Sequence, residues 1–174
     1  MIGRLMSRAM AAAPVAPDEP SPALGHRTRI LVVDSAPDAV AAVQGVLMAE
    51  NWEVITAQTG EEALGRARLE GCDAVVTSFH LDDMAAPALC EALRARSETL
   101  STPVIVLSDS TAVADRVASL RAGASDYLVK PPAPHELIAR LQALLDLRHE
   151  RAGFVAAIVG AKGGVGASML AVNL

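Results

Sequence analysis

Aromatic side chains are almost absent from this chain, which has one tryptophan, one tyrosine and two phenylalanines among 174 residues. Alanine, valine and leucine carry its apolar content instead. The two cysteines, Cys72 and Cys90, are too few for a disulfide framework and lack a metal-ligand spacing. No apolar run approaches the roughly 20 residues that a membrane-spanning helix needs. These absences favour a soluble domain with an aliphatic core.

Positive charge is also in short supply. The net charge of −5 argues against a general nucleic-acid-binding surface, so no nucleic-acid partner is expected. Residues 1–28 are rich in alanine and proline. Such a segment buries too little apolar surface to offset the entropy of ordering, so we expect a disordered tail there. The histidines show no metal-ligand spacing; they are His26, His80, His135 and His149.

Apolar runs and helical patterns alternate five times between residues 29 and 149. The runs have the β-branched and aliphatic content of strands in a buried parallel sheet. They are residues 29–34, 52–57, 73–77, 103–107 and 126–129. Helical patterns cover residues 37–48, 59–71, 86–95, 111–122 and 131–149. This alternation predicts an α/β fold with a doubly wound, five-stranded parallel sheet.

Three polar residues stand where predicted strands end. Asp34 ends the first strand, Ser78 follows the third and Lys130 follows the fifth. Ligands of parallel α/β sheets collect at the carboxyl ends of strands, so these side chains mark the expected site. Asp73 begins the third strand. At about 3.3 Å per residue it lies well over 10 Å away, which excludes it from the site.

Residues 29–147 resemble a two-component response-regulator receiver domain. The resemblance is carried by the sequences ILVVD, TAQTGEEAL, PVIVLS and AGASDYLVKP. It implies a flavodoxin-like receiver fold over residues 29–150, with a phosphorylation site at the strand ends. The family's two adjacent acidic positions fall on Asp34 and Ser35, and its acceptor aspartate falls on Ser78. The remaining site positions are the switch hydroxyl Ser108, the switch aromatic Tyr127 and the lysine Lys130.

Two of the three carboxylates of such a site are therefore serines. Phosphoryl transfer to an aspartate needs an acceptor carboxylate and a magnesium ion held by further carboxylates. Asp34 alone is a weak metal candidate, so no metal is expected, and Ser78 cannot form an acyl phosphate. We expect a degenerate, non-phosphorylated receiver that acts as an interaction module. The alternative is a working phosphoreceiver with an unconventional acceptor, for which Asp82 and Asp83 supply nearby carboxylates.

Residues 151–174 predict a linker and the start of a second, truncated domain. The sequence GFVAAIVGAKGGVGAS, from Gly153 to Ser168, predicts a buried strand followed by a glycine-rich, phosphate-cradling turn. It resembles the deviant Walker A motif of the ParA/MinD family. Ala161 and Ala167 replace the family's first glycine and phosphate-binding lysine. The matching positions of this incomplete nucleotide site are Lys162, Gly163, Gly164, Gly166 and Ser168.

A degenerate receiver followed by such a loop resembles the CpaE/TadZ-type family of Tad (Flp) pilus assembly proteins. That resemblance implies protein partners in a pilus or secretion machinery and a bacterial, cytoplasmic location, at the pole and peripheral to the inner membrane. It implies no enzymatic activity or cofactor for this fragment, and ATP with magnesium for the full-length protein. A third hypothesis is that the chain is the N-terminal part of a ParA/MinD-like ATPase.

The surface formed by the fourth helix, fifth strand and fifth helix is the expected route to a homodimer. The fourth helix contributes Val113, Val117, Leu120 and Arg121. The fifth helix contributes His135, Glu136, Arg140 and Leu144. The alternative is that the apolar members of this set belong to the core.

Overall fold

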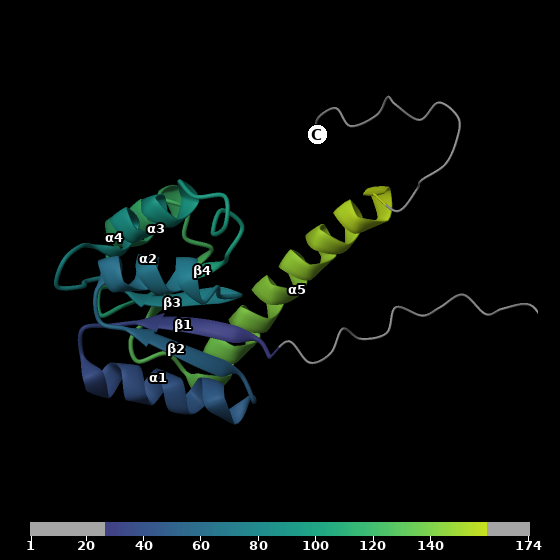
Figure 1. The fold of residues 1–174 in the computed structure, drawn as a ribbon. Helices are drawn as coiled ribbons and strands as arrows, with labels where there is room; N and C mark the ends of the chain where they lie inside the picture. Colours follow the sequence, from purple (N-terminus) through teal and green to yellow (C-terminus); the bar gives the residue numbers. More distant parts are fainter. Residues whose placement is uncertain (1–26, 160–174) are drawn as a thin grey trace, which may run out of the picture.

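The computed structural model describes residues 27–159 and contains one five-stranded sheet with helices on both faces (Figure 1). The strand order is β2-β1-β3-β4-β5, and every neighbouring pair is parallel. The predicted doubly wound α/β fold is confirmed. The strands are β1 Arg29–Val33, β2 Glu53–Ala57, β3 Ala74–Ser78, β4 Val104–Ser108 and β5 Asp126–Val129.

Local sequence signals explain where the helices begin and end. α1 has Pro37 in its first turn, where a missing N–H costs nothing. At the start of α2, the Thr59 side chain accepts the N–H of Glu62 at 3.2 Å, as the predicted cap requires. Gly123 ends α4 with φ +100°, which glycine adopts readily. The helices are α1 Pro37–Ala49, α2 Gly60–Leu69, α3 Ala86–Arg94, α4 Val113–Arg121 and α5 Pro134–Val159.

The sheet separates two apolar cores. α1 and α5 cover one face, and α2, α3 and α4 lie on the other (Figure 1). Strand residues alternate between the faces, so Val32 belongs to one core and Leu31 to the other. Leu137 and Leu141 fix α5, while Leu89 fixes α3. Burial of both faces explains the uninterrupted apolar strands and holds all five carboxyl ends at one edge.

α5 differs from the prediction at both ends. It begins at Pro134 and continues past His149 to Val159, so the predicted strand beginning at Gly153 is wrong for its described part. Alanine and arginine favour a helix, and the established turns of α5 supply the nucleus that helix growth requires. The expected nucleotide-binding residues, from Lys162 to Ser168, lie outside the described residues. Within the described ones, no helix combines the length and apolarity needed to span a membrane.

Candidate functional site

Asp34, Ser78 and Lys130 come together at the carboxyl edge of the sheet. Val33 of β1 pairs with Thr77 of β3, which places the next residues of the two strands side by side. β5 is registered through β4, so the residue after Val129 reaches the same edge. The sequence placed these three residues at strand ends, and parallel pairing turns that position into proximity.

The Lys130 ammonium joins the two oxygen-bearing side chains. Its Nζ donates to Asp34 Oδ2 at 2.5 Å and to Ser78 Oγ at 2.9 Å. Asp34 is 8% exposed and Ser78 is 7% exposed. The other Asp34 oxygen, Oδ1, accepts the N–H of Ala36 at 3.0 Å. The site is therefore a small, partly buried row of carboxylate, ammonium and hydroxyl.

Ser35, although next in sequence to Asp34, turns away from this row. Its hydroxyl donates to the Gln58 carbonyl at 3.1 Å and accepts the N–H of Asp82 at 3.1 Å. It thereby fastens the loop after β3 to the loop after β2. Ser35 stands at an expected site position, but its oxygen has a structural use.

Ser108 and Tyr127 meet at the loop after β4. The Ser108 hydroxyl accepts the N–H of Ser110 at 3.1 Å, and the Tyr127 hydroxyl donates to the Ser110 carbonyl at 2.9 Å. Tyr127 is 5% exposed, and the Arg116 guanidinium lies 5.5 Å from its ring centre. The backbone of Ser110 is thus held from two sides, and sequence reasoning did not single out this residue or Arg116.

The loop acids Asp82 and Asp83 do different things. The Asp83 carboxylate accepts the N–H groups of Gly60 at 2.8 Å and Glu61 at 2.9 Å, at the start of α2. These backbone hydrogen bonds lower the pKa of Asp83. Both Asp83 oxygens therefore bond to the start of α2, where they stabilise a helix terminus. Asp82 is exposed in the same loop.

The donor set does not fit magnesium. Magnesium prefers several charged oxygen ligands in octahedral geometry. Asp34 is the one carboxylate of the Lys130 row, and its Oδ2 already faces the ammonium. No group of three or more aspartate, glutamate, histidine or cysteine side chains suited to a metal occurs within residues 27–159. The Lys130 ammonium already neutralises Asp34, which weakens the attraction of this carboxylate for a second cation.

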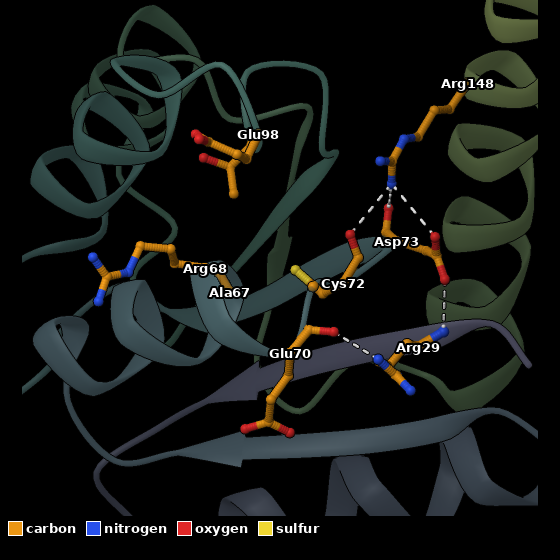
Figure 2. Close-up of a pocket in the computed structure, with 10 residues that line it drawn as sticks. Arg29, Ala67, Arg68, Glu70, Cys72, Asp73, Glu98 and Arg148 are labelled. Carbon is orange, nitrogen blue, oxygen red and sulfur yellow. Dashed lines mark hydrogen bonds and ion pairs between the residues drawn. The ribbon is translucent and has the colours of Figure 1, made fainter.

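A second polar cluster lies at the opposite edge of the sheet, as predicted for Asp73. The Asp73 carboxylate accepts the main-chain N–H of Arg29 at 2.9 Å. The Arg148 guanidinium donates to the carbonyls of Cys72 at 3.3 Å and Asp73 at 2.8 Å (Figure 2). A cavity of about 260 Å³ opens beside these residues, towards Arg68 and Glu98.

Comparisons with known proteins identify the fold and its relatives. The model of the response regulator receiver domain matches residues 30–142. The chain is 43% identical over 120 residues to the transcriptional regulatory protein PrrA of Mycobacterium tuberculosis, covering 69% of this chain and 51% of PrrA. It is 37% identical to the alkaline phosphatase synthesis transcriptional regulatory protein PhoP of Bacillus subtilis, covering 67% and 48%. The chain thus spans about half the length of these relatives.

Solved receiver domains share the fold. A CheY-like receiver domain protein of Methanospirillum hungatei superposes with a TM-score of 0.66 and 28% identity, covering 72% of this chain and 98% of that one. The receiver domain of the sensor histidine kinase PA1611 of Pseudomonas aeruginosa superposes with a TM-score of 0.65 and 26% identity, covering 69% and 98%. In that structure a magnesium ion is coordinated in the active-site cleft.

These findings correct the expected identity and function. The resemblance to CpaE/TadZ-type pilus assembly proteins is wrong as an identification, because the matching relatives are transcriptional regulatory proteins. The expected role as a non-phosphorylated module of a pilus machinery is wrong for the same reason. The expected polar location rested on that resemblance and loses its basis. The names of the relatives also conflict with the expectation of no nucleic-acid partner. The chain belongs to the response regulator receiver domain family.

Proposed function

We propose that this chain is a phosphoryl-accepting receiver of a two-component system. Because Ser78 stands at the family's acceptor position at the end of β3, the acceptor differs from the usual aspartate of that position. The observation that carries the proposal is the position of Lys130, whose ammonium lies within hydrogen-bond distance of Asp34 and Ser78 at the carboxyl edge. The relatives PrrA and PhoP, as transcriptional regulators, support the same class of function.

The site has the means to attract and hold a phosphoryl group. A lysine ammonium neutralises phosphoryl oxygens and is a strong hydrogen-bond donor to them. Lys130 is the sole lysine among residues 27–159. Its side chain is 17% exposed, so it can be approached from solvent while remaining fixed by its two partners. Asp34 and Ser78 supply the adjacent oxygens.

The test is phosphorylation by phosphoramidate, a small donor with a phosphorus–nitrogen bond, followed by intact-mass measurement. We expect the wild-type chain to gain one phosphoryl group. The variant Lys130→Met should react about 100-fold more slowly, the scale of a positioned acid–base group. Arg148→Met, at the opposite edge, is the matched control and should react like wild type. Failure of the folded wild-type chain to gain any phosphoryl group would overturn the proposal.

The same proposal includes a homodimer through the surface of α4, β5 and α5. Three apolar side chains of α4 lie outside the core, with Val113 72%, Val117 37% and Leu120 45% exposed. The alternative that the apolar members are core residues is therefore wrong for these three, whereas Leu144 of α5 packs against the core. On the same surface, Asp126 and Glu136 already pair with Arg140 of the same chain, at 2.6 Å and 2.8 Å, so the proposal of a second copy rests on the exposed apolar side chains of α4.

Sedimentation of a double charge variant tests this dimer. A specific interface buries roughly 1,200–2,000 Å², so Val113→Glu combined with Val117→Glu should shift dimer to monomer. Leu69→Glu is the matched control because Leu69 is 77% exposed on α2, away from this surface. A wild-type chain that sediments as a monomer at high concentration, phosphorylated or not, would contradict self-association.

The relatives also support a proposal for output and location. The chain spans 51% of PrrA, so in a regulator of that kind the other half would carry the contact with DNA. We place the receiver in the bacterial cytoplasm, where a sensor kinase could reach it. In this role the described residues accept a phosphoryl group and need no nucleotide of their own.

A further inference from the structure

Ser78 is the one side chain of the site whose oxygen bonds to Lys130 and has no second hydrogen-bond partner among the described residues. Among the described residues its Oγ has Lys130 Nζ as its hydrogen-bond partner, at 2.9 Å. It ends β3, at the centre of the sheet between β1 and β4. Its Cα partner on β4 is Leu107, whose apolar side chain offers the hydroxyl no hydrogen bond.

Each of the next three candidates accepts at least one main-chain N–H group, which Ser78 Oγ does not among the described residues. Asp34 uses Oδ1 for the Ala36 N–H and Oδ2 for the Lys130 ammonium. Ser108 is 2% exposed and its oxygen accepts the Ser110 N–H. Asp83 holds two N–H groups of α2.

Asp82, the remaining loop acid, is exposed and forms no ion pair with any cation in the part of the chain that the structure describes. A phosphoryl group placed there would lack a neutralising partner.

Resting on the proposed function, we propose that Ser78 is the phosphoryl acceptor and that it forms a phosphoserine ester without a metal ion. Serine hydroxyls become nucleophiles when a neighbouring base removes their proton, and serine–lysine pairs are one such arrangement. Here Lys130 joins the hydroxyl to the Asp34 carboxylate. The ammonium donates to both oxygens, so its proton would pass to Asp34 Oδ2, 2.5 Å away, which frees the nitrogen to accept the proton of Ser78 Oγ, 2.9 Å away.

The step balances with a phosphorus–nitrogen donor such as phosphohistidine or phosphoramidate. Ser78 Oγ attacks phosphorus, an oxygen–phosphorus bond forms, and the phosphorus–nitrogen bond breaks with its electron pair going to nitrogen. Lys130 gives a proton to Asp34 as its nitrogen takes the serine proton. The proton on Asp34 then passes to the leaving amine, which departs as its ammonium form. No oxidation occurs, and Lys130 ends as a cation beside the new phosphate.

The product would behave unlike an aspartyl phosphate. An acyl phosphate is activated towards water and towards hydroxylamine, whereas a phosphate ester of an alcohol is stable to both at neutral pH. The phosphorylated receiver would keep its phosphate until a phosphatase removed it. The chemistry of Ser78 therefore converts a self-erasing signal into a lasting one.

The experiment uses phosphoramidate with the wild-type chain in EDTA, followed by intact mass, fragmentation and hydroxylamine treatment. We expect one phosphoryl group on Ser78, formed equally in EDTA and in magnesium, and retained after hydroxylamine. Ser78→Ala should lose the adduct. Ser35→Ala, which changes the other substituted position, should keep it. Because fragmentation locates the phosphate in the wild-type chain, the assignment is decided even if Ser78→Ala folds poorly.

Each other outcome has a distinct meaning. A hydroxylamine-labile adduct on Asp34 or Asp82 would overturn the assignment to Ser78 and leave the proposed function standing. An adduct on Ser78 that forms only with magnesium would overturn the metal-free step. A folded wild-type chain that takes up no phosphoryl group under either condition would overturn this inference together with the proposed function.

Discussion

Each edge of the sheet holds a partly buried cation beside an aspartate, but the two cations are held in different ways. At the carboxyl edge, Lys130 is held by two side-chain oxygens, from Asp34 and Ser78. At the amino edge, Arg148 donates to two backbone carbonyls beside the Asp73 carboxylate (Figure 2). Both cations are partly buried and both face one aspartate, yet one is held by side chains and the other by the main chain.

That difference distinguishes a site capable of chemistry from a contact that only holds the structure together. Backbone carbonyls cannot move without moving the chain, so Arg148 fixes the two residues just before β3 to α5. Side-chain oxygens can rotate or take a new substituent while the strands stay in place. A lysine nitrogen also exchanges protons more readily than a guanidinium, which stays charged. Chemistry is therefore expected at the carboxyl edge and rigidity at the amino edge.

The largest expected effect comes from removing the ammonium at the carboxyl edge. Lys130→Met leaves Asp34, 8% exposed, without its cation. Leaving a buried charge unpaired costs about 3 kcal/mol or more, and we expect a loss of that size in urea denaturation. The double variant with Asp34→Asn should recover most of it because no buried charge remains. A loss below about 0.5 kcal/mol, as for a surface pair, would contradict this account.

Removing the cation of the amino edge should cost less. In Arg148→Met, Asp73 keeps the Arg29 N–H, and the carbonyls of Cys72 and Asp73 lose a donor at a position where Arg148 is 28% exposed. The variant loses two hydrogen bonds at about 1 kcal/mol each, so we expect a loss of about 2 kcal/mol in the same urea experiment. If this loss matched that of Lys130→Met, the contrast between the edges would fail.

A smaller effect concerns the third acid near the carboxyl edge. The N–H groups of Gly60 and Glu61 lower the pKa of Asp83 from its ordinary value of 3.8. A lowered pKa contributes stability above pH 3.8 that is lost as the pH falls through the folded-state value. Asp83→Asn keeps an acceptor oxygen without the titration. Its melting temperature should therefore fall less than that of wild type between pH 7 and pH 3, measured by circular dichroism.

The smallest effect concerns the thiol that lines the amino-edge cavity. Burial raises the pKa of Cys72 from 9.0 to about 11. At pH 8 a shift of two units reduces the thiolate fraction by about 100-fold, so iodoacetamide should label the folded protein that much more slowly than the urea-unfolded one. Cys90, which is 0% exposed, is the internal control and should be at least as slow. Equal labelling of Cys72 in both states would show that this edge is open.

Local patterns were sufficient to predict the fold and the position of the site. Strand bounds moved by one residue at most in β2, β3 and β4, and Thr59 caps α2 as its spacing with Glu62 predicts. Asp34, Ser78 and Lys130 could be placed together because the carboxyl ends of parallel strands share an edge. Each of these predictions depends on residues close in sequence or on a general rule of parallel sheets.

What could not be predicted depends on partners far apart in the chain. Asp83 meets the start of α2 across 22 residues, and Asp82 meets Ser35 across 47. No spacing rule signals such contacts, although a loop acid opposite a helix start is a pattern worth examining. The helical state of residues 153–159 was missed because a short apolar run fits a strand as well as a helix.

The length of α5 determines how a segment attached to its end is rotated about the helix axis. Its 26 residues extend about 39 Å at 1.5 Å per residue, and in Figure 1 its carboxyl end projects well beyond the sheet. Leu145 lies in the core and Arg148 still contacts the main chain beside β3, so the shaft of α5 is the part of the helix that follows Arg148. Each residue along that shaft turns the helix by about 100°. The direction of a segment joined to Val159, measured around the helix axis, therefore depends on the number of residues in α5. Inserting one residue would rotate the segment by about 100°, whereas inserting seven would return it to within about 20° of its first direction.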